Sequence, residues 1–336
     1  MADTTGPTTS KQLWAKETWI AAIRQIFFAK FMNKRNDDYN AVVYFTDAFK
    51  KEKGKTFNIS LMVPLTGSGV EDDGVLEGNE EALVYYDMSA NLKEYVHAVR
   101  LAGRLSEQSA AVDMRSDAKA ALSDWLAKKI DTLCVDALSA SPTANRVVYG
   151  AVNATNYATS DATINTNSTM STTLISIAKR KAQLATIGGA ESKIRPITVD
   201  GREMYVCFLH PYQAKAIKAS NEWQQAQREA NIRGDKNPIF SGALGIWDGV
   251  ILYEYERIKT YSNWGAASNL NGARALFCGA QALAIGVHKY PTWEEKAFDY
   301  NRKAGFATGV IMAVAKPKFN SEDYGVISID TYIATD

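Results

Sequence analysis

The chain has 336 residues, of which 46% are hydrophobic, so it can bury a sizeable core in one large or two ordinary domains. Its 38 basic residues nearly cancel its 37 acidic ones, and the net charge of +1 argues against a dedicated nucleic-acid binder. The N-terminus lacks an apolar signal segment and no apolar run could cross a bilayer. We therefore expect synthesis in a cytoplasm and no membrane partner.

The cysteines favour a reducing compartment. Cys134, Cys207 and Cys278 are far apart in sequence, and no CxxC pair occurs. An odd number of isolated cysteines in largely apolar surroundings is typical of small buried side chains with reduced thiols.

The first fifty residues predict one helix and one short strand. Apolar residues over 12–32 have the spacing of an amphipathic helix, and Lys16 and Arg24 are among the cations that make this segment basic. These cations fit either a solvated helix face or an arm that docks on an acidic neighbouring surface. A short strand is expected within 41–49.

A hairpin with an acidic tip is expected next. Residues 56–65 alternate, which predicts a strand whose buried face carries Phe57, Ile59, Leu61, Val63 and Leu65. A second strand-like run follows an acidic, glycine-rich segment that contains Glu71, Asp72, Asp73, Glu77, Glu80 and Glu81, and no Lys or Arg occurs between Lys55 and Lys93. Because an isolated two-stranded hairpin is marginal in water, we expect this one to lie on another molecule.

A long helix and a mixed second half complete the prediction. The helix should begin at about Arg104 or Ser106 and end at Leu138, a length of roughly 50 Å at about 1.5 Å per residue. Further helices are expected at 171–187 and 212–233, strands at 204–209, 249–255, 305–316 and 326–332, and an apolar segment at 275–287. This mixed order predicts the α+β class.

No arrangement of residues indicates catalysis, a cofactor or a metal. His97, His210 and His288 lack partners at metal-ligand spacing, and structural roles are favoured for all three. The Gly67–Gly69 loop lacks the Lys-Ser/Thr pair of a phosphate-binding loop. The acids of the tip do not have EF-hand spacing, although they could hold an adventitious ion. The tryptophans lie mostly beside apolar residues, which favours burial over carbohydrate binding.

Several segments, taken in order, carry a family resemblance. They are GKTFNISLMVPLTGSGVEDDGVLEGNEEAL at 54–83, YVHAVRLAGRLSEQS at 95–109, LSDWLAKKID at 122–131, FLHPYQAKAI at 208–217, KNPIFSGALGIWDGVILYE at 236–254 and GFATGVIMAVAKPKF at 305–319. The chain resembles a tailed-phage major capsid protein of the N-four-like family over nearly its whole length. This resemblance implies the Hong Kong 97-type capsid fold.

The resemblance also implies a division of the chain. Residues 1–40 would form an N-terminal arm and 54–102 the extended hairpin called the E-loop. The peripheral domain would comprise 41–53, 103–142 and 291–336, with a spine helix at 104–138, and the axial domain would comprise 143–290. Many phages of this type fuse a cleavable scaffolding segment ahead of the arm, whereas here the family-like sequence begins almost at once. We therefore expect scaffolding to be a separate protein or assembly to manage without one.

The implied function is structural rather than enzymatic. Copies would form hexamers and pentamers of an icosahedral virion shell that encloses double-stranded DNA without base readout, alongside portal, decoration and scaffolding proteins. The E-loop would lie on a neighbouring subunit, where its acids would meet basic residues, with Lys16, Arg24, Arg100 and Arg104 as candidates. The tip contains no lysine, so the sequence gives no basis for an isopeptide cross-link there.

Two alternatives remain open. An encapsulin-like compartment would share the fold class but enclose a cargo enzyme. A glycan-binding protein or an enzyme would use the aromatic-rich region 200–300.

Overall fold

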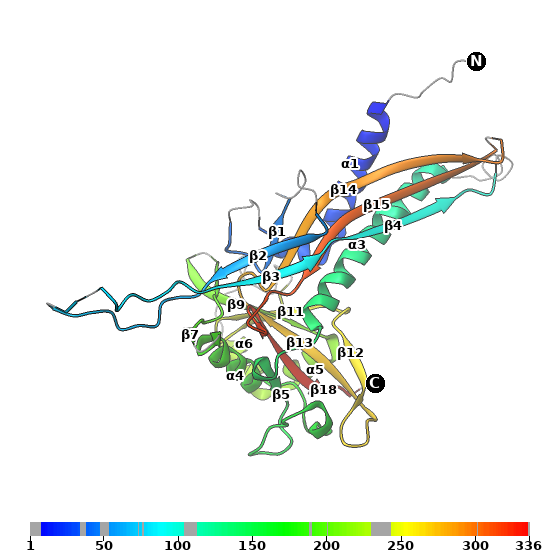
Figure 1. Cartoon of the computed structure of the whole chain (residues 1–336). Coiled ribbons are helices and arrows are strands. Elements are labelled where there is room, and N and C mark those ends of the chain that lie inside the picture. The colour runs from blue at the N-terminus through cyan, green and yellow to red at the C-terminus, as the bar shows by residue number, and fades with distance from the viewer. Residues whose placement is uncertain are drawn as a thin grey trace.

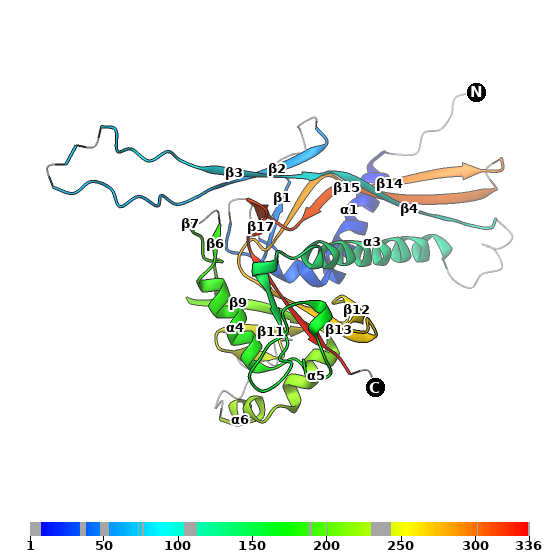
Figure 2. The same cartoon turned by 60° about the horizontal axis from the view of Figure 1, so that its bottom comes forward.

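The computed structural model describes residues 8–33, 38–47, 54–72, 74–75, 77–103, 113–187, 190–199, 201–229, 243–300 and 302–334. Helices and two main sheets are combined, which confirms the predicted α+β class. Figures 1 and 2 show a body from which one long hairpin projects.

The first main sheet has four strands in the order β1-β14-β15-β4. Its strands are β1 (Val43–Thr46), β14 (Leu283–Phe298), β15 (Lys303–Ala315) and β4 (Lys93–Arg100). β1 is parallel to β14, and the other two pairs are antiparallel. Helices α1 (Thr8–Gln25) and α3 (Met114–Ser139) pack against this sheet and against each other.

The second main sheet has eight strands. Its main path is β10 (Gly245–Trp247), β11 (Val250–Glu254), β9 (Arg202–Leu209), β13 (Leu270–Cys278), β18 (Val326–Tyr332) and β5 (Val147–Tyr149), while β12 (Thr260–Trp264) pairs with β13 and β8 (Ile197–Val199) with β9. The other elements of this part are α4 (Thr172–Gln183), α5 (Pro211–Ala219), α6 (Asn221–Glu229), η3 (Ala144–Arg146) and η4 (Asp161–Thr163).

Three two-stranded sheets are smaller. They pair β2 (Thr56–Met62) with β3 (Tyr85–Asn91), β6 (Thr186–Ile187) with β7 (Ala190–Glu191), and β16 (Lys318–Phe319) with β17 (Glu322–Asp323). The first of these forms the projection in Figure 1.

The long helix α3 begins at Met114, later than predicted. Asp113 is extended and its carboxylate accepts a hydrogen bond from the backbone N–H of Arg115, which caps the helix. Its 26 residues span about 39 Å rather than 50 Å. The predicted start at Arg104 or Ser106 lies outside the described residues. The predicted apolar spacing is confirmed, since Leu122, Leu126 and Ile130 are buried.

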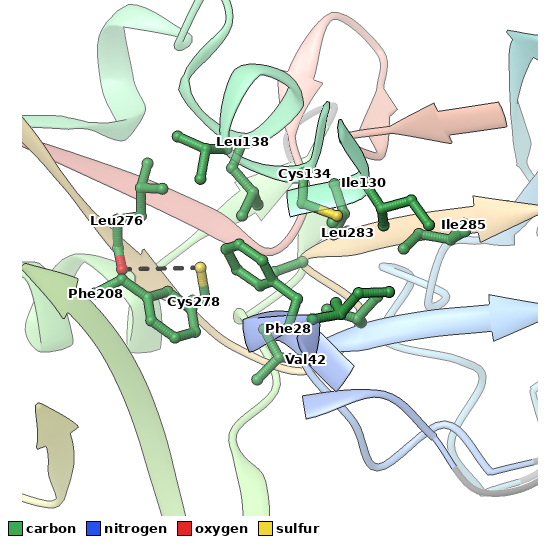
Figure 3. Close-up of a cluster of buried hydrophobic side chains, with 14 of the residues drawn as sticks. Phe28, Val42, Ile130, Cys134, Leu138, Phe208, Leu276, Cys278, Leu283 and Ile285 are labelled. Carbon is green, nitrogen blue, oxygen red and sulfur yellow. Dashed lines mark hydrogen bonds between the residues drawn. The ribbon is translucent and has the colours of Figure 1, made fainter. Parts of the chain in front are cut away.

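The main core joins the two large sheets. Figure 3 shows Phe28 of the short helix η1 (Phe27–Phe31), Ile130 and Cys134 of α3, Phe208 of β9 and Ile285 of β14 converging on one cluster. The predicted burial of all three cysteines is confirmed, and their thiols are free. Burial raises the pKa of these thiols well above the ordinary range.

Two predicted helices are divided. The predicted helix 12–32 ends at Gln25, because Ile26 is extended, and η1 follows. The predicted helix 212–233 is broken at Ser220, whose backbone is extended and whose hydroxyl accepts a hydrogen bond from the N–H of Trp223. Residues 230–242 lie outside the described part of the chain.

Sheet membership bears on the expected domain division. β18 is hydrogen-bonded to β13 and β5 in the eight-stranded sheet, whereas β14 begins in the four-stranded sheet at Leu283. We therefore propose that the chain returns to the peripheral domain near residue 283. We also propose that the closing strand, 326–332, belongs to the axial domain.

Candidate interaction surface

The projection, which we call the hairpin arm, comprises residues 54–91. β2 and β3 pair in antiparallel register from Thr56↔Asn91 to Met62↔Tyr85, and one further bond joins Val63 N–H to the Val84 carbonyl. The described residues between Val63 and Val84 form no strand, and we call them the arm tip. Figures 1 and 2 both show this tip extending away from the body.

The base of the arm is held by its own subunit. Phe57 is buried among Ala90, Ala284 and Ala313, and its ring also lies against Gly286. Further along, Ile59, Leu61, Tyr86 and Met88 pack on Ile187, Phe319 and Tyr324. The alternating face predicted for 56–65 is therefore confirmed as far as Val63, which is 7% exposed. The prediction is wrong for Leu65, which is 59% exposed because the arm has left the body there.

Glu81 braces the arm tip. Its carboxylate accepts hydrogen bonds from the Thr66 N–H at 2.8 Å, the Thr66 hydroxyl at 2.9 Å and the Gly67 N–H at 2.6 Å. These bonds hold the pKa of Glu81 below its ordinary value of 4.5. Since the bonds cross from one side of the hairpin to the other, Glu81 has a local structural role that the sequence pattern did not indicate.

The other predicted acids differ in their surroundings. Glu80 accepts a hydrogen bond from the Gly78 N–H at 2.7 Å. Glu71, Asp72 and Glu77 are exposed, and Asp72 has a positive φ of 50°. Asp73 lies outside the described residues. The exposed acids are therefore available to a partner, whereas Glu80 and Glu81 are already hydrogen-bonded within the tip.

Apolar side chains accompany these acids, a feature that the sequence analysis did not single out. Seven large hydrophobic residues at or beside the tip are exposed, with Val75 the most exposed at 69%: Met62, Leu65, Val70, Val75, Leu83, Val84 and Tyr85. Such a concentration on one projecting element is typical of a protein interaction site. Consecutive apolar residues at 83–85 were the available sequence signal.

Among the described residues, the predicted cations do not meet the predicted acids within one subunit. Arg100 is at the end of β4 with its guanidinium carbon 4.3 Å from the centre of the Phe298 ring, and Figure 1 shows that end of β4 opposite the arm tip. Lys16 and Arg24 are exposed on α1. Arg104 lies outside the described residues. Any pairing of Lys16, Arg24 or Arg100 with the described acids of the tip would require a second subunit.

The N-terminal segment packs on its own subunit. Trp14 lies against Trp293, and Trp19 lies edge-on to Tyr290, both on β14. The Asp131 carboxylate of α3 accepts hydrogen bonds from the N–H groups of Phe27 and Phe28 at the start of η1. Trp14 and Trp19 of α1 are thus packed within the subunit, while Lys16 and Arg24 are exposed.

The described residues offer no evident metal or membrane element. No group of three His, Cys, Asp or Glu side chains among them is arranged to hold a metal ion. No helix of the described part of the chain is long and apolar enough to cross a membrane. In the aromatic-rich region 200–300, Trp223 and Trp264 are buried, which removes them as exposed platforms for a sugar. His210 caps α5, in keeping with its predicted structural role.

Comparisons with known proteins give the same fold. The capsid of Ralstonia phage GP4 superposes with a TM-score of 0.80 at 29% identity, over 92% of each chain. The capsid asymmetric unit of Cyanophage Pam1 gives a TM-score of 0.79 at 23% identity, over 100% of each chain. The two-sheet body, long helix and projecting arm therefore define a Hong Kong 97-type capsid fold.

The family follows from the sequence comparisons. Residues 5–335 match the family described as phage capsid protein. The major capsid protein of Pseudomonas phage KPP25 is 30% identical over 368 residues, covering 96% of this chain and 95% of that protein. The chain belongs to the phage capsid protein family, and its function is that of a phage major capsid protein.

Proposed function

We propose that copies of the chain assemble into an icosahedral phage head in which the hairpin arm of each subunit lies on its neighbour. The observation that carries this proposal is the arm tip, whose exposed apolar and acidic side chains have no partner surface within the described part of their own subunit. Head-to-tail contacts of this kind are heterologous and close into rings, here hexamers and pentamers.

The apolar residues of the tip should contribute more than its charges. An exposed ion pair is worth about 0–1 kcal/mol, because water screens it and two side chains must be ordered. Burying one large aliphatic side chain is worth about 1.5–3 kcal/mol. The acids would then set orientation, with Lys16, Arg24 and Arg100 of a neighbour as candidate partners. Arg104 and Asp73 remain candidates from the sequence.

The shell would enclose double-stranded DNA without reading its bases. Near-neutral net charge fits this role, because tight phosphate binding would impede packaging and release. We further propose that the chain is synthesised in the bacterial cytoplasm and has no enzymatic activity. Its partners in the head would be portal, decoration and scaffolding proteins. An encapsulin-like compartment is less well supported, since the family and the curated relative belong to phages.

A deletion tests the role of the tip. Negative-stain electron microscopy of the purified wild-type protein should show closed shells. Deleting 66–81 should leave the circular dichroism spectrum and melting of the subunit intact, since the base of the arm is held by other residues, but should prevent stable shells. Normal, stable particles from this deletion would contradict the proposal.

Paired substitutions separate apolar from charged contacts. The Leu65→Ser/Val75→Ser variant should raise the critical concentration for assembly strongly, whereas Glu71→Gln/Glu77→Gln should raise it only a few-fold and mainly at low salt. Light scattering measures both. A larger effect of the charge substitutions would reverse the assigned order of contributions.

A further inference from the structure

Three cations from distant parts of the chain gather at the C-terminal end of α3. The Arg274 guanidinium donates a hydrogen bond to the Ser139 carbonyl at 3.1 Å, the Lys316 ammonium to the Ala140 carbonyl at 2.8 Å, and the Lys318 ammonium to the Ser141 carbonyl at 2.6 Å. The last turn of α3 has no basic residue of its own. We call Arg274, Lys316 and Lys318 the cation cluster.

The cation cluster satisfies a general need of helix ends. The last carbonyls of a helix lack intrahelical partners and carry partial negative charge, which cations stabilise. The chain also turns sharply here, since Ser141 has a positive φ of 36°, a backbone conformation that non-glycine residues rarely adopt. The hydrogen bond from Lys318 holds the carbonyl of that residue.

Two carboxylates keep the cluster in place. Asp323 lies 2.9 Å from the Lys316 ammonium and 3.5 Å from that of Lys318, and it also accepts a hydrogen bond from the Thr143 N–H. Asp330 accepts two bonds from Arg274, at 2.7 Å and 2.6 Å. Lys316, Asp323, Arg274 and Asp330 are all buried, so the geometry of this network is fixed by charge pairing.

The same short segment supports the base of the hairpin arm. The Lys318 N–H donates to the Met88 sulfur at 3.4 Å, and Phe319 and Tyr324 pack on the apolar residues of β2 and β3. Thr143, just after α3, exchanges hydrogen bonds with Asp323 and Ser321. Residues 316–324, which include the β16–β17 hairpin, therefore contact the end of α3 through charged side chains and the arm through Phe319 and Tyr324.

We propose that Lys316 and Lys318, acting through Asp323, are positioning residues that set the angle between α3 and the hairpin arm and so the curvature of the shell. This inference rests on the proposed role of the arm in contacting a neighbour. The seven residues of β2 alone span about 23 Å at about 3.3 Å per residue. Over that length a rotation of about 10° displaces the far end of the strand by about 4 Å, enough to break a side-chain contact.

Distance measurements on dilute subunits test the angle directly. Spin labels attached at Thr132→Cys on α3 and at Ala82→Cys in the tip measure the distance that depends on this angle. Labelling is confined to these two sites because the three native thiols are buried. The wild-type background should give one narrow distance distribution. Lys318→Met should at least double its width or shift its centre by several ångströms, whereas Lys318→Arg should restore it. Lys179→Met is a matched control, since Lys179 forms an ion pair with Asp248 away from the cluster.

Shell diameters and a milder variant complete the test. Lys318→Met shells should be heterogeneous in diameter while Lys318→Arg and Lys179→Met shells are uniform. Thr143→Val removes the hydrogen bonds of the hydroxyl without removing a charge, and it should also widen the distance distribution. This variant replaces Lys318→Met in the test if Lys318→Met does not fold. Unchanged distributions in the variants that fold would overturn the inference. Failure of the wild-type protein to form shells would instead overturn the proposed function.

Discussion

Phe57 is expected to hold the hairpin arm to the body, and Phe57→Ala tests this. The ring is 2% exposed and is enclosed by Ala90, Ala284, Ala313 and Gly286. These neighbours have at most one side-chain carbon and cannot fill the space left by the ring, although the partly buried Met88 and Leu92 of the same cluster can fill part of it. Replacing a buried phenylalanine by alanine costs about 3–5 kcal/mol, and less where the surroundings collapse. We therefore expect about 4 kcal/mol.

The loss should fall on the arm rather than on the whole subunit. Phe57 lies in a satellite cluster, separate from the main core around Phe28, Ile130 and Phe208. A cost of about 4 kcal/mol corresponds to a several-hundred-fold rise in the equilibrium for local opening. Hydrogen exchange of unassembled protein should show faster exchange at the amides of β2 and β3, with little change in β9 and β13.

A matched residue of the same strand provides the control. Met62→Ala removes a side chain that is 55% exposed, so the exchange of β2 and β3 should change by less than about 0.5 kcal/mol. Unchanged protection of the arm in Phe57→Ala would refute the reasoning. An equal loss of protection in β9 and β13 would refute it as well, because the arm would then unfold only with the body.

Three further predictions concern ionised groups. Hydrogen bonds from Thr66 and Gly67 lower the pKa of Glu81, so these bonds stabilise the tip fully above pH 4.5 and are lost as the pH falls through the lowered pKa. The amide chemical shifts of Thr66 and Gly67 should follow this titration. Glu81→Gln should abolish the pH dependence of these shifts, whereas Glu77→Gln should not. Asp131→Ala removes the acceptor of the Phe27 and Phe28 N–H groups and should cost about 1 kcal/mol in denaturant unfolding. Since burial raises the pKa of Asp131, the stability of the wild-type protein should fall as the pH rises above 3.8, and the variant should lack this pH dependence. Asp330→Asn leaves Arg274 buried without its carboxylate and should lower the free energy of unfolding by about 3–5 kcal/mol. The double variant Arg274→Met/Asp330→Leu should recover much of the lost melting temperature. A double variant less stable than Asp330→Asn would contradict this account.

Local spacing in the sequence determined much of the fold. The alternation from Phe57 to Val63 and the three- and four-residue steps of Leu122, Leu126 and Ile130 predicted a strand and a helix that the structure has. Both patterns depend only on backbone periods of two and 3.6 residues, which are properties of neighbouring residues. The resemblance of the ordered segments supplied the capsid fold, which periodicity alone would not have supplied.

Only the tertiary structure decided which distant groups meet. In the sequence all six acids of the tip were equal candidates for binding a partner, yet Glu81 is bonded to Thr66 and Gly67 on the opposite side of the hairpin. Nothing in the sequence indicated that Lys316 and Lys318 lie at the end of α3, because some 176 residues separate each from its carbonyl partner. Such pairings depend on how the sheets pack and not on local spacing, so residue periodicity carries no record of them.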